Sequence, residues 1–252
     1  MAAKLLFFLA VAGMASYRVL RMRQLGVGIW DALALRVNIH SLVQALIGIM
    51  IAAVVMASAF LIEWLTNLLA VENIGNSSAL MNDFSTPIVV AFVEEFVFRG
   101  VLLGCLTIWL RSGSLAIGLS AVLFAAAHLG NQHIDSSALL GYCVAGVVYG
   151  IGYMRTGGVW LSFGLHLGWN YAEGRVFGFP LSGYNVPDAL IAQHNNGVPL
   201  WTGGEYGPEA GIIGLAARFA VLLLTLAWLN SRYAKSAFGS ITGARSLTSG
   251  WS

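Results

Sequence analysis

Long apolar runs separated by short polar links dominate the chain from residue 41 onward. Crossing a hydrocarbon core takes about 20 apolar residues, and fewer where a helix is buried in protein. The pattern predicts six spanning helices, at residues 41–62, 87–110, 114–129, 137–154, 158–172 and 212–229. We therefore expect an all-α, polytopic membrane helical bundle with six core spans. An earlier apolar run, residues 5–17, predicts a further N-terminal membrane segment, either a short span or an interfacial helix.

The composition agrees with a membrane protein and excludes an ordinary soluble domain. Hydrophobic residues make up 58% of the chain and charged residues only 10%, whereas soluble domains carry about 25% charged residues. Thirty glycines favour close helix–helix packing in lipid. Cys105 and Cys143 both lie in apolar runs, which indicates buried thiols and no disulfide framework. A formal charge of +2 gives no indication of a nucleic-acid partner, so the expected surroundings are the lipid bilayer.

The placement of Lys and Arg predicts an orientation. Basic residues precede the first core span, occur at Arg111 and Arg155, and follow the last span, whereas the links 62–83 and 130–136 contain none. The link 174–211 has Arg175 as its single basic residue. Because cytoplasmic loops carry an excess of Lys and Arg, the alternation predicts a multi-pass cell-membrane protein with both flanking segments of the six-span core in the cytoplasm.

This topology divides the chain into three parts. Residues 1–40 form an N-terminal membrane-associated segment, residues 41–235 a membrane-embedded domain, and residues 236–252 a cytoplasmic tail. The candidate chemistry falls in a core at 87–172. The link 174–211, with four prolines and many Gly and Asn residues, predicts a long irregular loop.

The second span contains two adjacent glutamates and an arginine, which are costly at membrane depth and persist there mainly for function. Glu95 and Arg99 are four residues apart, so they can form an ion pair along one helix face. Glu94 is turned about 100° from Glu95, so its carboxylate can face elsewhere. One carboxylate is then held structurally, while the other is available for proton transfer.

Polar residues of two further spans fall at the depth of Glu94. His128 ends the third span, and His166 and Asn170 occupy the last two turns of the fifth. Because neighbouring spans run antiparallel, the start of the second span and the ends of the third and fifth lie on one side of the membrane. The positive-inside orientation places this side in the outer leaflet.

The spacing of these residues carries a resemblance to a known family. The chain contains, in order and on separate spans, Glu94-Glu95-x-x-x-Arg99, Phe124-x-x-x-His128 and His166-x-x-x-Asn170. This pattern resembles the CPBP family, the CAAX-protease and bacteriocin-processing (Abi) family, which includes the type II CAAX prenyl endopeptidases.

The resemblance implies an intramembrane endopeptidase and a role for each residue. Glu94 and His128 would hold and activate the attacking water. His166 and Asn170 would stabilise the tetrahedral oxyanion, as preorganised donors do in other hydrolases. The Glu95–Arg99 pair, with the aromatic ring at position 124, would support the site.

The sequence leaves the metal question open. Glu94, His128 and His166 could ligate zinc and leave one position for water. However, they come from three helices and lack the His-Glu-x-x-His spacing that indicates zinc by itself. We favour a glutamate-type protease without a metal or other cofactor, and keep a zinc metalloprotease as the alternative.

A second alternative belongs to another functional class. Polar clusters in membranes also mark transport pathways, so a transporter, or a peptide-binding maturation or immunity protein, could use the same cavity. The expected partner is a peptide or protein substrate at the membrane. A secreted or membrane-anchored peptide is favoured over a prenylated CAAX protein, because the latter is cytosolic while the site is expected near the outer face. The sequence does not define an oligomeric state.

Overall fold

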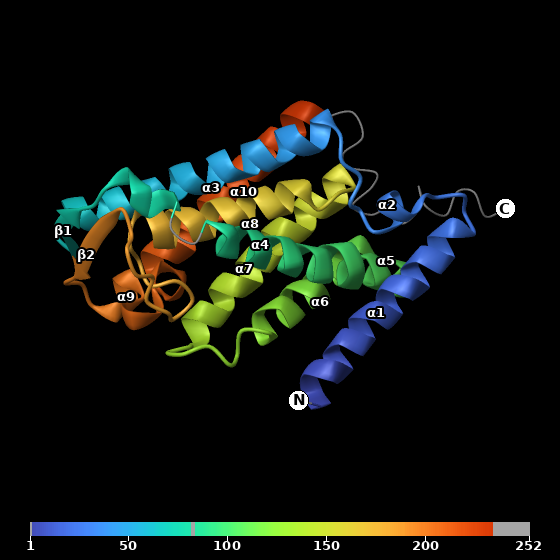
Figure 1. The fold of residues 1–252 in the computed structure, drawn as a ribbon, viewed down its shortest axis with the longest axis horizontal. Coiled ribbons are helices and arrows are strands. Elements are labelled where there is room, and N and C mark those ends of the chain that lie inside the picture. The colour runs from blue at the N-terminus through green and yellow to red at the C-terminus, as the bar shows by residue number, and fades with distance from the viewer. Residues whose placement is uncertain (1, 82–83, 234–252) are drawn as a thin grey trace.

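The computed structural model describes residues 2–81 and 84–233, so the tail expected at 236–252 lies outside the described residues (Figure 1). The fold is predominantly helical, as expected for an all-α bundle. Its α-helices are α1 (Ala2–Arg23), α2 (Ile29–Ala32), α3 (Ile39–Leu65), α4 (Ser85–Glu95), α5 (Gly104–Leu110), α6 (Gly113–Ala126), α7 (Ser136–Thr156), α8 (Trp160–Asn170), α9 (Pro199–Thr202) and α10 (Ile212–Tyr233). Two π-helical segments, η2 (Phe96–Leu103) and η3 (Tyr171–Val176), continue α4 and α8. Short 3₁₀ turns complete the helical elements: η1 (Ser77–Met81), η4 (Gly204–Tyr206) and η5 (Pro208–Ala210).

Every predicted core span coincides with helical structure. Three helices, α3, α7 and α10, are each long and apolar enough to cross a membrane. The second predicted span is built from α4, η2 and α5 in succession, and the fifth from α8 and η3. The N-terminal apolar run forms α1, which continues to Arg23. Figure 1 shows α1 lying obliquely beside the other helices, and it contacts η2 and α5.

Glycines bring the helix backbones into contact, as the composition predicted. A Cβ atom on Gly164 of α8 would stand 2.1 Å from the carbonyl oxygen of Ala45 in α3, and one on Gly48 would stand 2.6 Å from that of Leu161. Gly146 of α7 faces Ala121 of α6 in the same way, at 2.7 Å from its Cα. Side chains larger than hydrogen would separate these helices, so the glycines set the close packing that lipid-embedded helices require.

A small antiparallel sheet at one end of the bundle was not predicted. Strand β1 (Leu69–Ile74) pairs with β2 (Ile191–Asn195), with an irregularity between Val71 and Asn73. The expectation that residues 174–211 form only an irregular loop is therefore wrong, since this segment also contains α9 and two 3₁₀ turns. Figure 1 shows β1, β2 and α9 together at the end of the molecule remote from the start of α3.

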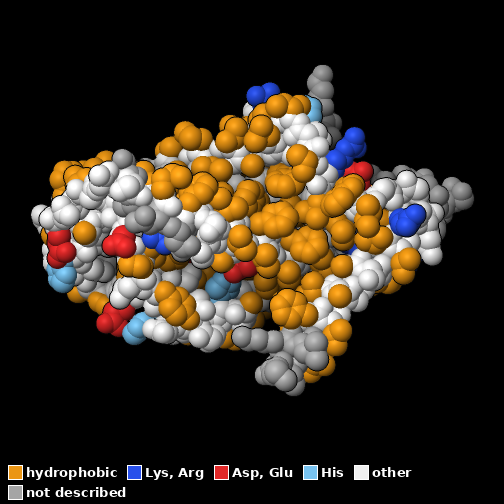
Figure 2. Space-filling view, in the orientation of Figure 1, with side chains coloured by type: hydrophobic (Ala, Val, Ile, Leu, Met, Phe, Trp, Pro, Cys, Tyr) orange, Lys and Arg blue, Asp and Glu red, His pale blue; other side chains and the backbone are white. Residues whose placement is uncertain are grey.

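The surface is divided between apolar and charged regions. Figure 2 shows hydrophobic side chains over the middle of the molecule, Asp, Glu and His mainly at the end that carries the strands, and Lys and Arg mainly at the other end. Leu42, Leu46, Met50 and Val54, spaced four apart on α3, are all more than half exposed. Such a stripe suits lipid contact. Both cysteines are free thiols.

Candidate active site

The two adjacent glutamates lie where α4 changes into a π-helix. Glu95 is the last residue of α4, and Arg99 lies within η2; π-helical turns of this kind occur frequently at functional sites. The side chains of Glu95 and Arg99 are both 0% exposed, and Arg99 Nη1 donates to Glu95 Oε1 at 2.9 Å. Glu94 differs, because its side chain is 29% exposed. The structure thus contains one buried, paired carboxylate beside one accessible carboxylate.

His166 of α8 lies between the two glutamates. Its Nδ1 is 2.9 Å from Glu95 Oε1, and its Nε2 is 4.0 Å from Glu94 Oε2. Glu95 therefore accepts from both the guanidinium of Arg99 and the imidazole of His166. A carboxylate on one ring nitrogen fixes the tautomer and the orientation of a histidine, so Glu95 presents the Nε2 atom of His166 to Glu94.

His128 reaches the same carboxylate from another direction. It lies in the turn after α6, where the backbone N–H of His128 bonds to the carbonyl oxygen of Ala125, three residues earlier. The carbonyl oxygen of Phe124 instead accepts from His128 Nδ1 at 2.8 Å. With Nδ1 occupied, His128 directs Nε2 toward Glu94 Oε2, at 3.9 Å.

Glu94 Oε2 is thus faced by the Nε2 atoms of two histidines. Because each Nδ1 donates a hydrogen bond, each neutral ring carries a lone pair on Nε2. Glu94 Oε2 itself is buried and has no hydrogen-bond partner among the described residues. A water hydrogen-bonded to two atoms 3.9–4.0 Å apart would lie about 2.8 Å from each, a normal bond length. The arrangement can therefore hold and polarise a water molecule.

Asn170 is not part of this convergence. It is the last residue of α8, one turn beyond His166, and is half-buried. The structure gives it no hydrogen bond to any described residue. The four residues expected at one depth therefore separate into three that face one another, Glu94, His128 and His166, and one that follows on the same helix.

Aromatic residues surround the histidines, and two of them were missed by the sequence analysis. The ring of Tyr142 lies parallel to His128, with centroids 3.9 Å apart, and the ring of Tyr149 lies parallel to His166 at 5.4 Å. Phe124 contacts both histidines edge-on, at 4.9 and 6.1 Å. The seven-residue spacing of the two tyrosines, which places them on one face of α7, was the signal available in the sequence.

The carboxylate of Glu94 and the imidazoles of His128 and His166 are ligand types that zinc accepts, but the distances between these atoms are longer than in a zinc site. Bonds of about 2.0–2.1 Å in tetrahedral geometry separate ligand atoms by roughly 3.4 Å, less than the 3.9 and 4.0 Å measured from Glu94 Oε2 to the two Nε2 atoms. In the part of the chain that the structure describes, no group of three or more His, Cys, Asp or Glu residues has metal-holding geometry.

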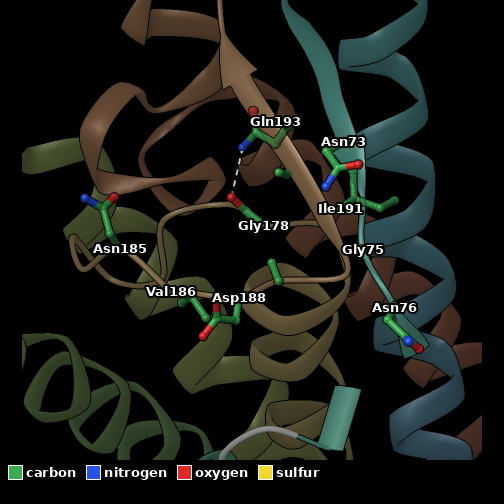
Figure 3. A pocket seen from close by; sticks show the side chains of 11 residues that line it. Asn73, Gly75, Asn76, Gly178, Asn185, Val186, Asp188, Ile191 and Gln193 are labelled. Atoms are coloured by element: carbon green, nitrogen blue, oxygen red, sulfur yellow. Dashed lines mark hydrogen bonds between the residues drawn. The ribbon is translucent and has the colours of Figure 1, made fainter. Parts of the chain in front are cut away.

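A polar pocket lies at the end of the bundle that carries the strands. It has a volume of about 530 Å³, and the trio of Glu94, His128 and His166 does not line it. Figure 3 shows the side chains of Asn73, Asn185, Asp188 and Gln193 around it, with Gln193 Nε2 donating to the carbonyl oxygen of Gly178 at 3.1 Å. Gly178 follows the π-helical continuation of α8, so this pocket adjoins the helix that carries His166.

A carboxylate and two imidazoles that converge inside an apolar helical bundle are compatible with an intramembrane hydrolase. Residues 76–172, which contain all three motifs, match the family model described as "Type II CAAX prenyl endopeptidase Rce1-like". The match covers less than half of the chain, and it supports an assignment to the CAAX-protease (CPBP) family. No curated protein and no solved structure matches the chain.

Proposed function

We propose that this protein is a glutamate-type intramembrane endopeptidase that hydrolyses a peptide bond of a secreted or membrane-anchored substrate. The family supports a CAAX-type membrane protease in general. The observation that carries the finer proposal is the convergence of His128 Nε2 and His166 Nε2 on one oxygen of Glu94.

Catalysis begins with a water held between Glu94 and His128. The water donates one hydrogen bond to Glu94 Oε2 and one to His128 Nε2, which leaves its oxygen lone pairs free to attack the carbonyl carbon. Glu94 takes a proton as the new C–O bond forms, and returns it to the amine nitrogen as the C–N bond breaks. General base catalysis of this kind contributes typically 10²–10⁴-fold to the rate.

His166 faces the developing oxyanion, with the Asn170 amide as the second donor. The Nδ1–H of His166 donates to Glu95, which fixes the orientation of the ring. Because Nδ1 already carries a proton, donation from Nε2 to the oxyanion uses the imidazolium form of the ring. Arg99 also donates to Glu95 Oε1, so this buried carboxylate is held by two partners.

The substrate approaches from the face at which the strands lie. Side-chain exposure rises from 0% at Glu95 through 7% at His166 and 13% at His128 to 29% at Glu94, so the site opens on the Glu94 side. The amide-rich pocket beside Gly178 suits the polar flank of an extended peptide. With several membrane passes and positive-inside orientation, this face is the outer one.

A transporter or peptide-binding protein remains the competing proposal, and two buried carboxylates favour it. Glu63 of α3 and Glu173 of η3 are 1% and 0% exposed, and each has a carboxylate oxygen without a hydrogen-bond partner in the described chain. Buried carboxylates within membrane-spanning segments mark proton pathways as well as hydrolytic sites. Peptide cleavage distinguishes these two functions.

The decisive experiment is cleavage of a fluorogenic peptide library by purified, chelator-treated protein, with Glu94→Ala and His128→Ala as controls. Turnover that survives chelation and disappears in both variants supports the glutamate-type mechanism. Turnover that is lost on chelation and restored by Zn²⁺ would instead make the trio metal ligands. Absence of cleavage, together with pH-dependent transport that requires Glu94, would favour the competing function.

A further inference from the structure

Two tyrosines of α7 lie flat against the two histidines of the site. Tyr142 and His128 have ring centroids 3.9 Å apart and ring planes 17° apart; for Tyr149 and His166 the values are 5.4 Å and 16°. The two tyrosines are seven residues apart, two helical turns on one face. Tyr142 is 3% and Tyr149 4% exposed.

We propose that Tyr142 and Tyr149 are positioning residues for the hydrolytic reaction, because each ring fixes the plane of one catalytic histidine. This inference rests on the proposed function. The tyrosines touch neither the water nor the peptide, and they act only through His128 and His166.

The need for such contacts follows from how the histidines are held. Each imidazole has one hydrogen bond, from Nδ1, to Phe124 O in the case of His128 and to Glu95 in the case of His166. A single bond leaves the ring free to rotate about that direction, since the second side-chain torsion of histidine has broad minima. A flat ring packed on one face, with Phe124 edge-on beside it, removes this freedom. The Nε2 atoms then stay directed at Glu94.

Tyr142 is itself anchored by a buried network. Its hydroxyl donates to Glu209 Oε2 at 2.9 Å and accepts from Tyr206 at 2.9 Å. Glu209 forms a buried ion pair with Arg218 of α10, and the guanidinium of Arg218 lies 4.4 Å from the ring centroid of Trp169 in α8. This network joins the segment after α8 to α7, α8 and α10, so Tyr142 is held in place on the side away from His128.

Paired substitutions separate the ring from the hydroxyl. Tyr142→Leu removes both, whereas Tyr142→Phe removes only the hydroxyl. We expect Tyr142→Leu to lower kcat about 10- to 100-fold, the range seen when an orienting partner of a catalytic or ligating residue is lost, with KM nearly unchanged. Tyr142→Phe should recover most of this loss. Tyr149→Leu and Tyr149→Phe should behave in parallel through His166.

The matched control is Tyr153→Leu. Tyr153 is also a buried tyrosine of α7, but its hydroxyl accepts from Arg18 at 2.6 Å and it belongs to a different apolar cluster. Its replacement should lower the melting temperature and leave kcat unchanged. This control separates a general effect of removing a ring from α7 from the loss of histidine orientation.

A second measurement does not depend on turnover. The chain has five histidines, so ring signals in histidine-labelled protein can be assigned by NMR, with His128→Gln identifying His128. Stacking on Tyr142 shifts the His128 ring protons upfield; this shift should persist in Tyr142→Phe and disappear in Tyr142→Leu. Unchanged kcat in Tyr142→Leu, or equal impairment of the Phe and Leu variants, would overturn the inference. If the unmodified protein cleaves no peptide, the proposed function fails, whereas a His128 signal that does not respond to Tyr142→Leu refutes the stacking contact itself.

Discussion

Two isosteric substitutions at adjacent positions should have opposite consequences. Glu94→Gln and Glu95→Gln each replace a carboxylate by a carboxamide of nearly the same shape. Glu95 is fully buried and bonded to Arg99 and His166, whereas Glu94 is partly exposed and its Oε2 atom has no hydrogen-bond partner in the described chain. Glu95→Gln should therefore affect mainly stability, and Glu94→Gln mainly catalysis.

The magnitudes follow from these contacts. Glu95→Gln leaves the guanidinium of Arg99, which is 0% exposed, without a compensating charge. Breaking a buried pair in this way costs about 3–5 kcal/mol in free energy of unfolding. Glu94→Gln removes no protein hydrogen bond made by Oε2, so the free energy of unfolding should change by about 0.5 kcal/mol or less. It removes the proposed general base, however, and turnover should fall about 10²–10⁴-fold.

The assay combines denaturant unfolding in detergent, followed by circular dichroism, with peptide cleavage under conditions where all variants are folded. Glu95→Gln should unfold at much lower denaturant concentration, and Glu94→Gln should unfold with the unmodified protein while losing turnover. If Glu94→Gln is destabilised as strongly as Glu95→Gln, Glu94 has a structural partner and the division between the two carboxylates is wrong. Full activity in Glu94→Gln would refute its role as base.

Three further predictions concern packing and the buried network. Gly164→Ala should destabilise the fold by about 1–3 kcal/mol in thermal unfolding, because its Cβ would stand 2.1 Å from the carbonyl oxygen of Ala45; Gly118→Ala, which has no atom within 4 Å, is the control and should be neutral or stabilising by up to about 1 kcal/mol. Glu209→Gln leaves the buried guanidinium of Arg218 without its charged partner and should lower the free energy of unfolding by about 3–5 kcal/mol in denaturant unfolding. A smaller decrease would show that the pair is hydrated. Burial, reinforced by the nearby carboxylate of Glu209, raises the pKa of Tyr206 from 10 to about 12. The folded state then binds the phenol proton more tightly, so the free energy of unfolding should fall as pH rises between these values, and less steeply in Tyr206→Phe.

The sequence was sufficient to predict the helices and the proximity of Glu94, His128 and His166. Runs of about 20 apolar residues have few alternatives to a helix in lipid, and antiparallel neighbours bring the start of one span to the end of the next. This reasoning brought Glu94, His128 and His166 together correctly, although they are up to 72 residues apart in sequence.

The remaining features have weak or no signals in a single sequence. Strands β1 and β2 are short and more than 100 residues apart, so neither gives a hairpin pattern. The π-helical turns shift hydrogen bonds by one residue without altering the apolar run. Tyr142 and Tyr149 look like ordinary packing residues of an apolar span, because aromatic rings are common there. Their role is apparent only once the histidines that they contact are known.

The same contacts that make the trio resemble a metal site also explain how it can work with water alone. In both cases the Nδ1 atoms must be engaged so that Nε2 is presented to the reacting centre, as they are in His128 and His166. Zinc would require Glu94 to become a ligand, and the three atoms to close by about half an ångström from 3.9–4.0 Å. The trio would then contain no free carboxylate to accept the proton of the water. With water between them, the observed spacing needs no closure, and Glu94 keeps its role as base. Turnover that is retained after chelation, with Glu94→Gln inactive, follows from this arrangement.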